Sequence, residues 1–94
     1  MARYKTKPYS NKPCLPGQEF VFTMPDGREV GKARSVADIV RMLKIAPLSS
    51  VLHHANGGHF APWLEMIGEK ETAGKIRDIK GSDETVRKKL VQAF

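Results

Sequence analysis

Glycine and proline interrupt the apolar periodicity of this chain so often that no helix or strand in it can be long. The interruptions after residue 19 are Pro25-Asp26-Gly27, Pro47, Asn56-Gly57-Gly58, Gly68 and Gly81. Each supplies turn or helix-end chemistry, because proline fixes φ and glycine accepts positive φ. A chain of 94 residues has the length of one domain. It must therefore fold as several short elements around one small core.

The first pair of elements is a predicted β-hairpin. Residues 19–23 (Glu-Phe-Val-Phe-Thr) are aromatic and β-branched, which is typical of a strand, and Arg28-Glu29-Val30 forms a short return strand after the Pro25-Asp26-Gly27 turn. The two-residue period of a strand places Phe20 and Phe22 on one face. An isolated hairpin is marginal, so this face is expected to pack on helices.

Five short helices are predicted to follow. They begin after Ser35, at Pro47, at His59 or Phe60, at Glu69, and after Ser82 or Asp83. Ser35 and Asp38 form a variant capping box, in which each side chain reaches a backbone N–H of the other. The sequence predicts an α+β fold, a hairpin packed on a bundle of four or five short helices. The predicted apolar faces are Val36, Ile39, Val40 and Leu43; Leu48, Val51, Leu52 and Ala55; Phe60, Trp63, Leu64 and Ile67; Thr72, Ala73, Ile76 and Ile79; and Val86, Leu90, Ala93 and Phe94.

The net charge of +6 is unevenly distributed along the chain. Residues 1–18 carry four basic residues and no acid, together with three prolines, and are predicted to be an extended basic leader. Residues 19–94 carry 12 basic and 10 acidic residues and are predicted to be a single globular domain. Only one cysteine is present, Cys14, which excludes an internal disulfide framework and a cysteine-rich zinc site. The absence of a long apolar run or an apolar N-terminal stretch predicts a cytoplasmic protein without membrane contact.

Several motifs occur in a fixed order between residues 19 and 79. They are Phe20-Val21-Phe22, Asp26-Gly27-Arg28-Glu29-Val30, the predicted helix at 36–43, His53-His54, His59-Phe60-Ala61-Pro62-Trp63, Ile67-Gly68-Glu69 and Ala73. In this order and spacing the chain resembles a small uncharacterised domain family found largely in archaea. That family usually carries an acidic residue at the position of His59. The resemblance implies the fold described above and, loosely, an archaeal source; it implies no catalytic residues.

Three histidines are the only concentration of reactive side chains. Adjacent helical residues project about 100° apart, so His53 and His54 are not expected to chelate one ion easily. His54 and His59 can approach each other across the Asn56-Gly57-Gly58 turn, but no cysteine lies near them in the sequence. The sequence favours a scaffold role, in which one histidine packs against Trp63 and bonds a backbone carbonyl. It predicts no metal and no cofactor. Two alternatives stay open: a histidine-based metal site, and a surface role in which a histidine contacts phosphate or a stacked base.

Enzymatic activity is not indicated. Cys14 and Ser49-Ser50 lack the surrounding motif of an activated nucleophile, and Gly57-Gly58 lacks the spacing and lysine of a phosphate-binding loop. Glu69 and Glu71 fit a solvated helix start. The helical spacing of Phe60 and Trp63 favours core packing over an exposed aromatic patch, with Trp63 at the centre of the core.

The basic residues indicate a nucleic-acid-associated protein that binds mainly the phosphate backbone, RNA or a ribonucleoprotein more than DNA. Tyrosines interleaved with the leader's cations suit base stacking beside phosphate contacts. The alternative is a protein-interaction adaptor that uses the hairpin edge or the helix faces. The sequence leaves open whether the cations share one face or are paired with acids. The predicted nucleic-acid-binding residues are Arg3, Tyr4, Lys5, Lys7, Tyr9, Lys12, Arg28, Lys32, Arg34, Arg87, Lys88 and Lys89.

Overall fold

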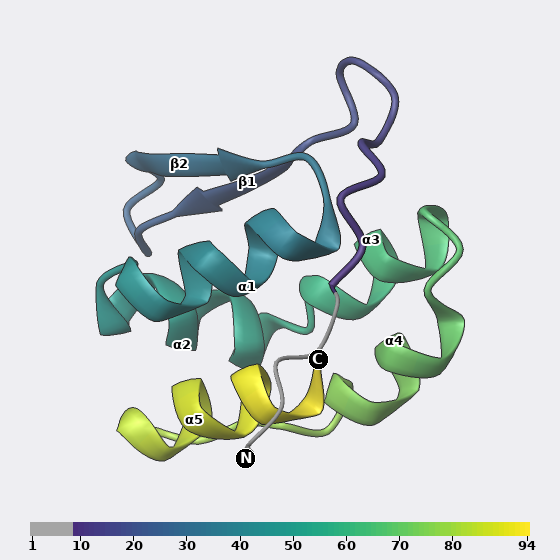
Figure 1. Ribbon diagram of the computed structural model, residues 1–94. Helices are drawn as coiled ribbons and strands as arrows, with labels where there is room; N and C mark the ends of the chain where they lie inside the picture. The colour runs from purple at the N-terminus through teal and green to yellow at the C-terminus, as the bar shows by residue number, and fades with distance from the viewer. Residues whose placement is uncertain (1–8) are drawn as a thin grey trace, which may run out of the picture.

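The computed structural model describes residues 9–94 and confirms the α+β fold. A two-stranded antiparallel sheet, β1 (Phe20–Thr23) and β2 (Glu29–Ala33), precedes all the helices. The hairpin lies over the first two helices, α1 (Val36–Ile45) and α2 (Leu48–Gly57), as Figure 1 shows. The last helix, α5 (Glu84–Ala93), covers the opposite side of these two helices. The molecule is therefore layered, with α1 and α2 in the middle.

Two helices of seven residues each complete the bundle beside these layers. They are α3 (Phe60–Met66) and α4 (Lys70–Ile76), which pack on each other, and α4 also contacts α5. The predicted fourth helix extended to residue 79, but α4 ends at Ile76, and the chain turns before α5. Among residues 9–94, no helix has the length and apolar character needed to cross a bilayer.

The helix caps form largely as local sequence chemistry requires. Ser35 is the N-cap of α1 and its Oγ accepts a hydrogen bond from the Asp38 N–H. Asp38 does not reach back to Ser35, however; its carboxylate accepts from the N–H of Arg34, one residue earlier. Asp83 caps α5 by accepting from the Thr85 N–H.

The core lies between the hairpin and the helices. Phe20 and Phe22 are buried on one face of the hairpin, as predicted, and β1 packs on α2 through them. Trp63 is 8 % exposed, and its Nε1–H donates to the carbonyl oxygen of Gln18 at 2.7 Å. That bond helps to hold the segment before β1 against the body.

The buried face of α2 differs from the predicted one. Val51 and Ala55 are buried as expected, but Leu48 and Leu52 are only half-buried. Ser50 and His54 take their places in the interior. The helix is therefore rotated so that two polar side chains face the core.

The predicted leader is partly attached to the domain. Residues 9–18 form no helix or strand, but the Cys14 N–H donates to the Arg34 carbonyl at 2.7 Å and the Ala37 N–H donates to the Ser10 carbonyl at 3.0 Å. Tyr9 and Cys14 pack against the core. Contact with the body thus begins before the predicted boundary at residue 19.

Candidate functional site: a cluster of three histidines

A chain reversal at the end of α2 brings His59 back to the helix that carries His53 and His54. Gly58 adopts φ 69°, the left-handed conformation that glycine accepts without strain. The N–H of His59 then donates to the carbonyl oxygen of His54 at 3.0 Å. The Asn-Gly-Gly sequence therefore does more than stop the helix, because it folds the next histidine onto the previous two.

The three imidazole rings form one compact group, called here the imidazole cluster (His53, His54 and His59). Their ring centroids lie 4.9, 5.2 and 5.1 Å apart in edge-on arrangements. One ring nitrogen from each lies within 4.8 Å of the others. The angle between adjacent helical residues led us to expect that His53 and His54 do not easily chelate one ion, but their rings lie closer together than that angle indicates, because both lie beside the ring of His59.

His54 is the buried member of the cluster. It is 4 % exposed, and its ring packs against the rings of Phe20, Phe22 and Phe60 at centroid distances of 5.0, 5.6 and 5.8 Å. A scaffold role for one histidine was expected, but with Trp63 and a backbone carbonyl. The structure instead gives it phenylalanine neighbours and a backbone N–H, that of Thr23, 2.9 Å from its Nε2.

That hydrogen bond determines the tautomer of His54. A backbone N–H can only donate, so Nε2 accepts and the ring proton of neutral His54 resides on Nδ1. His54 Nδ1 lies 3.0 Å from His59 Nδ1, so it donates to that nitrogen. The neutral cluster is thereby an ordered chain of hydrogen bonds from Thr23 to His59.

Burial, with smaller contributions from the charges of the neighbouring His53 and His59, lowers the pKa of His54 from its usual 6.5 to about 4. Protonation of Nε2 would also break the bond from Thr23, because two N–H groups would then face each other. His54 is therefore a neutral ring at physiological pH.

This shift predicts a loss of stability in mild acid. The pKa of folded His54 lies below that of the unfolded chain, so its contribution is complete above pH 6.5 and is lost as the pH falls toward about 4. The full loss is about 3 kcal/mol, because one pKa unit corresponds to about 1.4 kcal/mol. Urea unfolding at pH 7.5, 6 and 5 measures the part of this loss that occurs above pH 5, about 2 kcal/mol at about 1.4 kcal/mol for each pH unit below 6.5. The control is His54→Gln, which keeps a polar side chain but cannot titrate; equal pH dependence in both proteins contradicts the prediction.

The cluster borders solvent on one side. His53 and His59 line an open surface pocket together with Ser49, Leu52 and Asn56. His59 is exposed and His53 is half-buried. Cys14 lines a different pocket, beside Val36 and Ile67, so the thiol is not part of the cluster. The pocket offers an approaching ligand imidazole nitrogens together with the polar side chains of Ser49 and Asn56, and no carboxylate of residues 9–94 lines it.

The predicted basic residues do not come together in the same way. Arg3, Tyr4, Lys5 and Lys7 lie outside the described residues. Tyr9 is half-buried against the core, so its ring is less available for base stacking than the sequence indicated. Lys12, Lys32, Lys88 and Lys89 are exposed; Lys88 and Lys89 are neighbours on α5, Lys32 lies on β2 and Lys12 precedes the hairpin.

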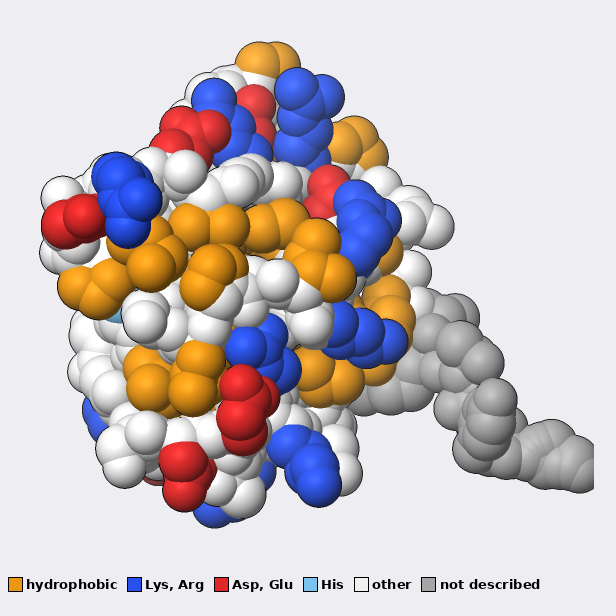
Figure 2. Space-filling view, turned by 90° about the vertical axis from the view of Figure 1, so that its left-hand side faces the viewer, with side chains coloured by type: hydrophobic (Ala, Val, Ile, Leu, Met, Phe, Trp, Pro, Cys, Tyr) orange, Lys and Arg blue, Asp and Glu red, His pale blue; other side chains and the backbone are white. Residues whose placement is uncertain are grey.

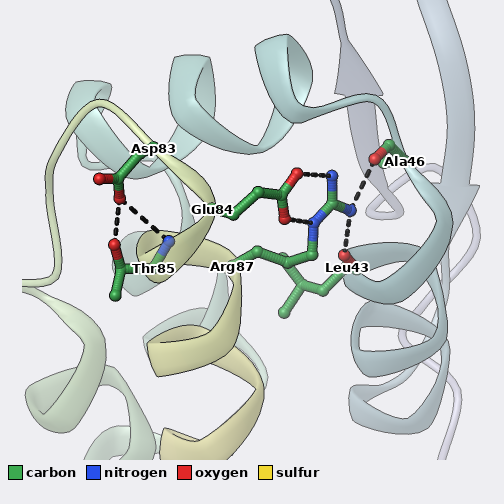
Figure 3. Close-up of polar contacts among 6 residues, drawn as sticks. All are labelled: Leu43, Ala46, Asp83, Glu84, Thr85 and Arg87. Carbon is green, nitrogen blue, oxygen red and sulfur yellow. Dashed lines mark hydrogen bonds and ion pairs between the residues drawn. The ribbon is translucent and has the colours of Figure 1, made fainter.

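Arg87 has a structural role that the sequence did not reveal. Its side chain is 18 % exposed, and Nη1 donates to the carbonyl oxygens of Leu43 and Ala46, both at 2.7 Å (Figure 3). Glu84 pairs with the same guanidinium at 2.8 Å. These bonds occupy the guanidinium, so Arg87 has fewer free donors for a phosphate than the sequence indicated.

In the part of the chain that the structure describes, arginines form ion pairs with carboxylates and lysines do not. Each of its five arginines pairs with a carboxylate: Arg28 with Asp26, Arg34 with Glu19, Arg41 with Asp38, Arg77 with Glu65, and Arg87 with Glu84. Between residues 9 and 94 no lysine forms such a pair. On the face in Figure 2, basic side chains stand in separate groups, several beside acidic ones.

Comparison of the chain with protein-family models, with curated proteins and with solved structures gives no match. The described residues are therefore the basis for assigning a function.

Proposed function

We propose that the protein binds the phosphate backbone of a nucleic acid, RNA or a ribonucleoprotein in preference to DNA, without catalysing a reaction on it. The observation that carries this proposal is the contrast between paired arginines and unpaired lysines in residues 9–94. Lysine ammonium groups without a carboxylate partner can neutralise phosphates at no cost in broken ion pairs. The arginines would first have to leave their acids.

The sequence of the first eight residues supports the same proposal. Arg3, Lys5 and Lys7 add three positive charges with no acid among them, and Tyr4 offers a ring for base stacking. The cations of the folded domain are spread over its surface, which favours contact with the phosphate backbone of the nucleic acid over sequence-specific recognition of its bases. We therefore expect binding that depends strongly on salt and weakly on sequence.

Removing unpaired lysines should weaken this binding more than removing paired arginines. On a single-stranded RNA, log Kd plotted against log salt has a slope of about 0.7 for each phosphate neutralised. The double variant Lys88→Gln/Lys89→Gln should therefore lower the slope by about 1.4. Fluorescence anisotropy with a labelled oligoribonucleotide between 50 and 300 mM salt measures this, and the same titration with Arg3→Gln/Lys5→Gln/Lys7→Gln tests the N-terminal segment.

The matched control is Arg28→Gln/Arg77→Gln, which changes the net charge equally but removes arginines that already have carboxylate partners. A smaller change of slope in this control supports contact by lysine. Equal changes in the two double variants would mean that net charge alone drives association. No binding at low salt would contradict the proposal as a whole.

A protein-interaction adaptor is the second candidate, and exposed apolar side chains favour it. Ile45 is 70 % exposed at the end of α1, and Val21 is exposed on the outer face of β1. Figure 2 shows a broken apolar band across one face of the molecule. A complex that survives nuclease treatment and is lost in Ile45→Lys would support this candidate over nucleic acid.

We also propose that residues 19–79 belong to the largely archaeal domain family that their motifs resemble. The hairpin, α1, the histidine pair on α2 and the start of α3 follow one another along the chain in the order that the resemblance implies. This membership adds support to the fold and none to a particular activity.

A further inference from the structure

The spacing of the nitrogens in the imidazole cluster approaches that of a metal site. Zinc bound by imidazoles at about 2.0–2.1 Å in tetrahedral geometry sets the ligand nitrogens about 3.3 Å apart. His54 Nδ1 and His59 Nδ1 are already 3.0 Å apart, and the third ring offers a nitrogen within 4.8 Å of both. His53 borders the open pocket, so rotation of its side chain can close the remaining gap.

We propose that His53, His54 and His59 form a binding site for one divalent late first-row transition-metal ion, with zinc as the reference ion. Imidazole suits zinc, copper and nickel, and the absence of carboxylates among the three ligands disfavours calcium and magnesium. Three protein ligands leave a fourth position for water or another ligand. The pocket lined by Ser49, Leu52 and Asn56 lies on the side where that position would open.

Gly57 makes room for the cluster. A Cβ built on this residue would lie 2.5 Å from His59 Nε2 and 2.7 Å from Cε1 of the same ring, closer than atoms can approach. Gly57 is the last residue of α2 and has an ordinary helical backbone, so alanine is tolerated there except for this collision. Alanine at 57 would therefore force the His59 ring out of its present position without changing any ligand.

Thr23 would serve as the outer partner of the buried ligand. Coordination through Nδ1 of His54 requires its proton to move to Nε2, which now accepts from the Thr23 N–H. The Thr23 hydroxyl oxygen lies 3.5 Å from Nε2 and can accept the relocated proton. Metal binding would break the bond from the Thr23 N–H, and Thr23 would have to shift so that its hydroxyl accepts from Nε2–H in place of the N–H facing that proton. The amide resonance of Thr23 would report this change.

The test is calorimetric titration of the full-length, chelator-treated protein with zinc chloride at pH 7.5, in a Cys14→Ser background that removes the thiol. We expect one ion per chain. Gly57→Ala and His59→Ala should each weaken binding at least about tenfold, the scale on which altered metal sites lose affinity. Gly74→Ala is the matched control, because a Cβ there meets nothing within 4 Å, and its affinity should equal that of the parent.

Nuclear magnetic resonance supplies a second measurement. Zinc should shift the side-chain nitrogens of all three histidines and the amide of Thr23 together, at one equivalent. The site is refuted if zinc does not bind, if Gly57→Ala and His59→Ala bind as tightly as the parent, or if the shifts involve only one histidine. Thermal melts show whether each variant is folded. If Gly57→Ala does not fold, the zinc affinity of His59→Ala decides the outcome, because His59 is exposed and its loss should not prevent folding.

Discussion

Replacing Arg87 with methionine should lower the free energy of unfolding by about 2–4 kcal/mol, because hydrogen bonds that involve a charged group contribute about 1.5–3 kcal/mol each. The guanidinium joins α5 to the end of α1 by donating to the Leu43 and Ala46 carbonyls, as Figure 3 shows. These two carbonyls lie where α1 ends, so no later turn of that helix satisfies them. Methionine retains much of the side-chain volume but leaves them without this donor.

Urea denaturation of three variants tests this role. Arg28→Met is the control, since its pair with Asp26 is exposed, with 73 % of the arginine side chain accessible, and exposed pairs contribute only about 0–1 kcal/mol. Arg87→Lys should fall between wild type and Arg87→Met, because one ammonium cannot reproduce the geometry of the guanidinium. If Arg87→Met is no less stable than Arg28→Met, the link between α1 and α5 is unimportant.

Replacing Trp63 with alanine should cost about 3–5 kcal/mol, a large part of the stability of a domain this small. Trp63 is almost fully buried, and its ring lies 6.0 Å from that of Phe20 in an edge-on arrangement. Its loss would open a cavity between α3 and β1. It would also remove the hydrogen bond to Gln18, which helps to anchor the segment before the hairpin.

Trp63→Phe separates these two effects. Phenylalanine keeps most of the apolar contact but has no N–H, so it should cost about 1–2 kcal/mol for the lost bond and the smaller ring. Circular dichroism during chemical denaturation gives both values. A loss below about 1 kcal/mol for Trp63→Ala would show that this side chain is not central to the core.

The parts of the fold that depend on neighbouring residues were predictable from the sequence. The hairpin follows from the Pro25-Asp26-Gly27 turn and the alternation of Phe20 and Phe22. The start of α1 follows from Ser35, and the start of α5 from Asp83. Each of these signals involves only a few consecutive residues, so the structure it predicts does not depend on how distant parts of the chain pack.

The orientation of α2 was not predictable in this way. Leu48 and Leu52 fit a helical apolar stripe, yet Ser50 and His54 are the buried side chains. Periodicity alone ranks leucine above histidine for burial. The aromatic rings of Phe20 and Phe22 and the N–H of Thr23 provide an environment in which a neutral imidazole is satisfied, and this environment exists only after the hairpin has docked.

The role of Arg87 was hidden for a similar reason. Its carbonyl partners, Leu43 and Ala46, are more than 40 residues away in the sequence. Every residue has a backbone carbonyl, so residue identity does not indicate which of them will accept a hydrogen bond. The imidazole cluster was predicted in part. The sequence indicated the three histidines and the Asn56-Gly57-Gly58 turn, and it predicted that His54 can approach His59. That His53 turns toward the same point depends on side-chain rotation, which spacing does not specify.

The central claim about the candidate site is that hydrogen bonds from Thr23 to His54 and from His54 to His59 order the metal-free imidazole cluster. Long-range proton–nitrogen correlation of the histidine side chains at pH 7.5, in the metal-free protein, tests it directly. The structure predicts that His54 holds its proton on Nδ1, that its Nε2 is unprotonated, and that this tautomer is lost only near pH 4. A His54 ring protonated on Nε2, or a mixture of both tautomers titrating near pH 6.5, would contradict the account.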